Sequence, residues 1–174
     1  YRLPAEKEIV LELKADDHRS HTETLSFTAN EKRLLKIELE EVTLPVEGKD
    51  FMVESVAMTM IWVKPGTFLM GSPASEKDRE NDETLYTVTL TEGYWLGKYE
   101  VTQAEWERVM GSNPSEYKGA DRPVEEVSWT AVTSFCDKLT ALERRAGRLP
   151  TGMAYQLPTE AQWEYACRAG TKTR

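Results

Sequence analysis

The sequence predicts a loop-rich α+β protein with a small antiparallel β region at its N-terminus. Short runs of alternating apolar residues, typical of strands, occupy the first half of the chain, and three short helix signals occupy the second half. Long regular elements are few, which favours an α+β class over a bundle or a barrel. At 174 residues the chain has the size of one domain, or of one domain with a small addition.

Residues 1–44 predict a β region. Runs 8–13, 22–28 and 34–39 alternate in hydropathy and are separated by polar turns, so we expect three antiparallel strands. Their apolar residues are too few to fold alone, which indicates that further strands precede them. Residues 45–56, with Pro45, Gly48 and Asp50, predict a linker. We expect a second domain over residues 57–174, in which Met58–Val63 and Tyr86–Thr91 are strands.

Three helices are predicted from their end signals. Thr102 with Glu105, and Thr159 with Gln162, have the spacing of capping boxes, and Ser128 can cap a third helix. Glycines that favour left-handed helix ends follow at 111, 147 and 170. Each helix has a tryptophan near its start. The favoured interpretation is that all five tryptophans pack inward, with an aromatic shelf for a ligand as the alternative: Trp62, Trp95, Trp106, Trp129 and Trp163.

Charge and hydropathy exclude two classes of partner. The net charge is −8 and basic residues form no cluster, so we expect no nucleic-acid binding. No apolar run approaches the roughly 20 residues that cross a bilayer, so no membrane span is predicted. The acidic segment 75–83 lacks the ligand order of a calcium loop and predicts a solvated loop.

Few residues could carry catalysis. The only histidines are His18 and His21, which excludes imidazole chemistry in the second domain; with no completing ligand they predict exposed turn residues and not a zinc site. Cys136 and Cys167 have neither Cys-x-x-Cys spacing nor a neighbouring histidine. Both lie on predicted inner helix faces, where buried inert thiols and disulfide half-cystines are the two interpretations.

Four ordered motifs give the chain a family resemblance. They are WVKPGTFLMGS (62–72), YWLGKYEVTQ (94–103), RPVEEVSW (122–129) and LPTEAQWEYA (157–166). Together they closely resemble the formylglycine-generating enzyme, or sulfatase-modifying factor, family. The resemblance covers about residues 57–174, the N-terminal half of a family domain, and implies the family's loop-rich fold, which is related to C-type lectins. The first 44 residues resemble the last strands of PEGA-type β repeats of bacterial proteins.

The resemblance also implies where chemistry would be found. Family enzymes oxidise a sulfatase cysteine to formylglycine with oxygen and a copper ion held by two cysteines of the C-terminal half. Those positions fall outside this sequence, so no catalytic, cofactor-binding or metal residue is assigned here, and copper is implied only if a C-terminal half is present. Cys136 and Cys167 match positions that form structural disulfides in some members. Tyr86 stands where many members have histidine.

These features predict a non-catalytic binding or interaction module of the family. The alternative is the N-terminal fragment of a formylglycine-generating oxidase, cut after Arg174, whose C-terminal piece carries the active site. A half-domain would expose the faces that carry Trp129 and Trp163, and water-soluble proteins seldom leave such surfaces bare. We therefore expect the partner to be the chain's own C-terminal half or another protein.

Overall fold

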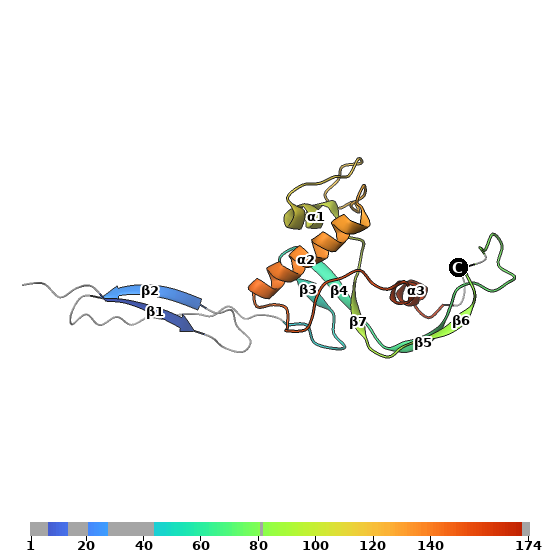
Figure 1. Cartoon of the computed structure of the whole chain (residues 1–174), viewed down its shortest axis with the longest axis horizontal. Helices are drawn as coiled ribbons and strands as arrows, with labels where there is room; N and C mark the ends of the chain where they lie inside the picture. The colour runs from blue at the N-terminus through green and yellow to red at the C-terminus, as the bar shows by residue number, and fades with distance from the viewer. Residues whose placement is uncertain (1–6, 14–20, 28–43, 81, 172–174) are drawn as a thin grey trace, which may run out of the picture.

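The computed structural model describes residues 7–13, 21–27, 44–80 and 82–171 (Figure 1). In the N-terminal region, β1 (Lys7–Leu13) pairs with β2 (His21–Phe27) in antiparallel register, with Ile9 opposite Leu25. Two of the three predicted N-terminal strands are thereby confirmed. The third, at 34–39, and His18 lie outside the described residues.

Two small antiparallel sheets follow. The first has the order β3 (Phe51–Val53), β4 (Met58–Val63), β7 (Tyr94–Gly97), and the second pairs β5 (Gly66–Met70) with β6 (Tyr86–Leu90). Because β4 leads directly into β5 and β6 into β7, the sheets form one long bent ribbon (Figure 1). The predicted strands at 58–63 and 86–91 are confirmed, the second ending at Leu90. Strand β3 falls within residues 45–56 and pairs with β4.

Glycines at the bend of the ribbon allow large rings to approach the backbone. A Cβ atom on Gly93 would collide with the Trp62 ring, and one on Gly66 would collide with Tyr165 of the last helix. Trp62 lies opposite Trp95 across β4 and β7, with ring centroids 4.5 Å apart. The bend is therefore a place where only glycine fits between strand and ring.

The three predicted helices are all present in the described part of the chain. They are α1 (Gln103–Met110), α2 (Trp129–Arg145) and α3 (Glu160–Arg168). Thr102 and Thr159 close complete capping boxes, and the Ser128 side chain accepts a hydrogen bond from the Ala131 amide. Gly111 ends α1 in the left-handed conformation, whereas α3 ends at Ala169, which takes that conformation one residue before Gly170.

The hydrophobic core lies between the β3–β4 end of the ribbon and helices α1 and α2. Trp106 of α1 stacks on Phe135 of α2 with centroids 5.2 Å apart and parallel planes. Buried around this pair are Val53, Val56, Met58 and Leu139. Burial of this kind is the main source of stability, so the core fixes α2 against the ribbon.

A buried glutamine organises the loop between α1 and α2. Gln103, 1% exposed, donates through its amide nitrogen to the carbonyls of Tyr117 and Pro123. Its amide oxygen accepts from the Asn113 side chain and the Gly119 backbone. All four hydrogen-bonding positions of the amide are thus used. The sequence patterns did not indicate this role.

Candidate functional site

Two of the tryptophans predicted to be buried are exposed, and that prediction was wrong. Trp106 is 3% exposed, but Trp129 and Trp163 are 73% and 58% exposed. Trp129 is the first residue of α2, and the buried residues Phe135 and Leu139 of this helix lie farther along it. Burial of a large aromatic side chain is strongly favourable, so an exposed one indicates a surface that can bind a partner.

The orientation of Trp163 follows from how α3 is held on the ribbon. Tyr165 packs on Phe68 of β5 with ring centroids 5.3 Å apart. Glu164 accepts from the Gly71 amide at 2.9 Å, and Arg168 donates to the Gly71 carbonyl at 2.7 Å. The helix therefore turns its 164, 165 and 168 positions to the ribbon, and no residue of α3 is buried. Trp163 is left on the other side.

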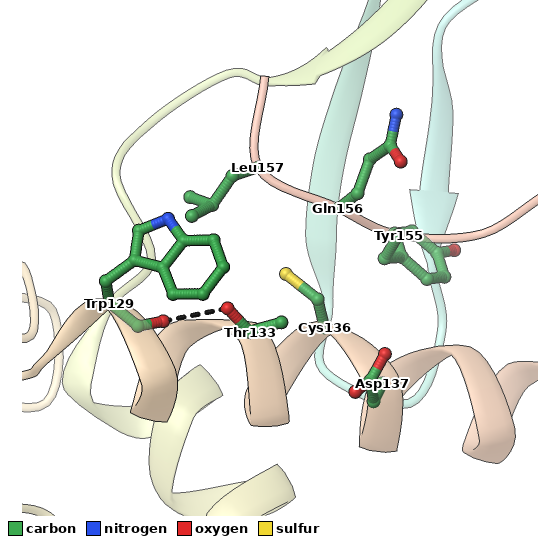
Figure 2. A pocket seen from close by; sticks show the side chains of 7 residues that line it. All are labelled: Trp129, Thr133, Cys136, Asp137, Tyr155, Gln156 and Leu157. Atoms are coloured by element: carbon green, nitrogen blue, oxygen red, sulfur yellow. Dashed lines mark hydrogen bonds between the residues drawn. The ribbon is translucent and has the colours of Figure 1, made fainter. Parts of the chain in front are cut away.

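A pocket lies beside Trp129, between α2 and the strand-like segment that precedes α3. Its cavity volume is about 200 Å³. Figure 2 shows the Cys136 sulfur directed between Trp129 on one side and Tyr155 on the other, with Leu157 near the indole. The lining residues are Trp129, Thr133, Cys136, Asp137, Tyr155, Gln156 and Leu157.

The wall formed by residues 153–157 is fixed to α2 by hydrogen bonds. The Tyr155 amide donates to the Thr140 hydroxyl at 2.9 Å, and Arg144 donates to the Met153 carbonyl at 2.9 Å. Opposite, the Thr133 hydroxyl donates to the Trp129 carbonyl at 2.9 Å (Figure 2). The pocket is consequently built from restrained segments on both sides.

A buried ion pair links Glu143 near the end of α2 to Arg148 just beyond it, and a hydrogen bond links Glu143 to the turn after β3. Glu143, 2% exposed, accepts two hydrogen bonds from Arg148 at 2.7 and 2.6 Å and one from the Ser55 amide at 3.3 Å. Burial alone would raise the pKa of Glu143, but the hydrogen bonds from Arg148 and Ser55 outweigh it and hold the pKa below its usual value. Both partners therefore stay ionised at neutral pH.

The electrostatics of the pocket make it inert rather than reactive. Burial, with the negative charge of Asp137, raises the pKa of the Cys136 thiol, which stays protonated at neutral pH. Burial, with the charge of Glu143, raises the pKa of Tyr155. A protonated thiol and a neutral phenol suit a surface that binds apolar groups, and neither is prepared for nucleophilic attack.

The residues predicted from chemistry do not come together. Cys136 lies half-buried in the pocket, while Cys167, predicted on an inner face, is exposed on α3; both are free thiols. Within the described ranges, no three or more His, Cys, Asp or Glu side chains gather in a way that could hold a metal ion.

In the acidic loop, the guanidinium group of Arg79 is hydrogen-bonded at both of its ends. Arg79 donates to the Ser72 hydroxyl at 3.2 Å and to the Glu83 carbonyl at 2.9 Å. Across the part of the chain that the structure describes, no helix combines the length and apolar character that a membrane crossing requires.

The ribbon with its three capped helices defines a loop-rich α+β module of the formylglycine-generating-enzyme type. Residues 49–174 match the sulfatase-modifying factor enzyme 1-like domain, and the chain belongs to that family.

Two curated relatives illustrate the similarity. The chain is 32% identical over 145 residues to the chaperone protein LppX of Paenibacillus barcinonensis, covering 69% of this chain and 49% of that protein. It is 32% identical over 90 residues to the formylglycine-generating enzyme of Mus musculus, covering 52% of this chain and 20% of the enzyme. The chain thus spans at most about half the length of the curated relatives it matches.

Two solved structures share the fold. Treponema denticola variable protein 1 superposes with a TM-score of 0.56 at 29% identity, over 71% of this chain and 57% of that one. PvdO from Pseudomonas aeruginosa superposes with a TM-score of 0.58 at 25% identity, over 72% of this chain and 53% of that one.

Proposed function

We propose that this chain is a non-catalytic interaction module of the sulfatase-modifying factor family and binds a polypeptide through an apolar surface. This surface, called the tryptophan face below, consists of Trp129, Leu157, Trp163 and the pocket beside Trp129. The observation that carries the proposal is the exposure of these three large side chains, two of which, Trp129 and Leu157, line a restrained pocket. Aromatic residues are enriched in protein interfaces, and large exposed apolar patches mark binding sites.

One comparison supports a role in interaction. The relative from Paenibacillus barcinonensis is named as a chaperone protein. The pocket contributes a protonated thiol and apolar walls, which suit binding better than turnover.

The test combines native mass spectrometry with an activity assay. We expect a polypeptide partner to travel with the chain when it is isolated from its native source, and Trp129→Ser with Trp163→Ser to release it. We expect no copper-dependent oxidation of a sulfatase-derived cysteine peptide, with the mouse enzyme as the positive control. Oxidation of that peptide by the isolated chain would refute the non-catalytic role.

A second function is supported by the similarity to formylglycine-generating enzymes. In this proposal the chain is the N-terminal piece of such an oxidase, and a C-terminal piece supplies the copper ligands. Cys136 and Cys167 would then be half-cystines bridged to that piece. A mass increase of the chain under non-reducing conditions, lost on reduction and accompanied by peptide oxidation, is the expected result. A complex without a disulfide between the pieces and without peptide oxidation would contradict this second function and favour the interaction module.

We further propose that residues 1–44 are the end of a PEGA-like β repeat, supported by the antiparallel pairing of β1 with β2. Deleting these residues should leave the melting temperature of the remaining domain unchanged. A large drop would mean that the β region is part of the family domain.

A further inference from the structure

We infer that the pocket beside Trp129 receives one bulky apolar side chain from the polypeptide that forms the other half of the family domain. The inference rests on the proposed function, since it names the partner of the tryptophan face. Three observations carry it: the size of the pocket, the chemistry of its walls and the share of its relatives that this chain spans.

The pocket has the size of a single aromatic side chain. A cavity of about 150 Å³ lined by apolar side chains accommodates benzene, and this one measures about 200 Å³. Drug-sized ligands require cavities of about 300 Å³ or more. A phenyl, indole or leucine side chain therefore fits, whereas an extended cofactor does not.

The walls of the pocket suit an apolar group. The Trp129 indole, the Leu157 side chain and the uncharged Cys136 thiol form apolar surface (Figure 2). Asp137 and Gln156 also line the pocket, and neither side chain has a hydrogen bond or ion pair with any residue that the structure describes. Both side chains are exposed and therefore hydrated, which leaves the apolar walls as the feature that selects the occupant. The partner segment thus carries a bulky apolar residue.

The source of this segment follows from the relatives. This chain spans 49% of LppX, 57% of the Treponema protein and 53% of PvdO, so each of these proteins contains a comparable length of polypeptide beyond the shared part. Leu157 belongs to the pocket wall and lies three residues before α3, so the pocket and the exposed side of α3 adjoin in the chain. An apolar pocket beside an exposed tryptophan suits a segment of such additional polypeptide better than a small ligand.

Residue-resolved oxidative footprinting tests the inference. Hydroxyl-radical oxidation is compared between these 174 residues and the complete product of the native gene. We expect Trp129, Leu157 and Trp163 to lose most of their oxidation in the complete product. Tyr99 and Tyr117, which are 70% and 65% exposed and outside the tryptophan face, serve as internal controls and should stay reactive.

A filled pocket supplies the second measurement. Cys136→Phe should occupy the cavity and restore oxidation of Trp129 in the complete product, whereas the matched variant Cys136→Ala should leave Trp129 protected. Circular dichroism of both variants checks that the fold is retained. If Phe and Ala behave alike, the pocket receives no side chain of the partner.

Three other outcomes would overturn the inference. They are a native product without further residues, continued oxidation of Trp129 in a longer product, and protection of Trp129 by self-association of the 174-residue chain in sedimentation experiments. The last would make a second copy the occupant. Copper-dependent peptide oxidation, by contrast, would refute the non-catalytic function and leave this docking surface standing.

Discussion

Helices α1 and α3 begin with the same sequence signals and end in different environments. Each has a threonine cap, a capping box and a tryptophan four residues after the cap. Trp106 of α1 is 3% exposed and Trp163 of α3 is 58% exposed. Capping residues thus decide where a helix starts, while the elements packed against it decide which face is buried.

The two helices differ in what they contact. The side of α1 that carries Trp106 meets α2 and the sheet, where Phe135 supplies a stacking partner. Helix α3 contacts the ribbon mainly through Tyr165 and the Glu164–Arg168 ion pair, which hold Gly71. On the side of Trp163 the described chain offers no buried surface, so the burial expected of that ring needs another polypeptide.

The largest expected difference is between the two tryptophans. Trp106→Ala should lower the free energy of unfolding by about 3 to 5 kcal/mol, because it removes a ring from the core. Trp163→Ala should lower it by less than about 1 kcal/mol, since that ring is exposed. Urea denaturation of both variants provides the measurement. Equal losses of unfolding free energy would mean that Trp163 is as buried as Trp106 and would contradict the proposed tryptophan face.

Ion pairs extend the same comparison. Arg148→Ala leaves the buried Glu143 carboxylate unpaired and should cost about 3 to 5 kcal/mol. Arg168→Ala breaks the more exposed pair with Glu164 on α3 and should cost about 1 kcal/mol or less. Thermal and urea unfolding of both variants gives the measurement, and similar losses would contradict the difference in burial.

Acid should lower the stability of the fold partly through the Glu143–Arg148 pair. The pKa of Glu143 is lower in the folded than in the unfolded state, so its contribution is complete above the ordinary glutamate pKa and is lost as the pH falls through the folded value. Glu143→Gln should therefore flatten the decrease in stability on acidification, and an unchanged pH profile would mean that the pair contributes nothing to it.

A smaller difference is expected at the first position of each helix. Gln103→Leu removes the buried amide that is bonded to four groups of the loop and should cost about 2 to 3 kcal/mol. Glu160 is the corresponding residue of α3 and is exposed, so Glu160→Leu should change stability by less than about 0.5 kcal/mol. Calorimetry of both variants distinguishes a buried network from a surface position.

The smallest expected difference is between the caps. Thr102→Ala and Thr159→Ala each remove one capping side chain and should each cost about 1 kcal/mol. Matching values from urea denaturation would confirm that the local signals are equivalent. A much smaller cost at Thr159 would show that the first turn of α3 is frayed. The exposure of Trp163 would then follow from a weak helix start and not from the elements packed against α3.

Sequence patterns predicted the features that depend on neighbouring residues. Helix starts at 103, 129 and 160 and the strand at 58–63 follow from capping and alternation, and the structure confirms them. The family follows from its motifs. Patterns failed where distant residues decide: Trp129 at the first turn of α2 is exposed although Leu139 on the same predicted face is buried, and α3 is turned by its contacts with Gly71.

The pocket shows the same limit. Cys136 could be singled out from the sequence, but Tyr155 and Leu157 reach it only because the Thr140 hydroxyl and Arg144 hold residues 153–157 against α2. No local spacing reports such a contact. Gln103 was likewise missed, because a polar residue at the first turn of a helix is ordinarily solvated.

The Gln103 network has a consequence for the dynamics of the loop between α1 and α2. The amide protons of Ser115, Tyr117 and Gly119 are held by Asn113, Glu125 and Gln103 at 2.8 to 3.0 Å, without belonging to a helix or a strand. Exchange of the Gly119 amide with solvent deuterium requires the opening of the buried Gln103 side chain, which lies one turn before Trp106 in α1. This irregular segment is therefore tied to the core at Gly119, whose amide belongs to the last unit to unfold.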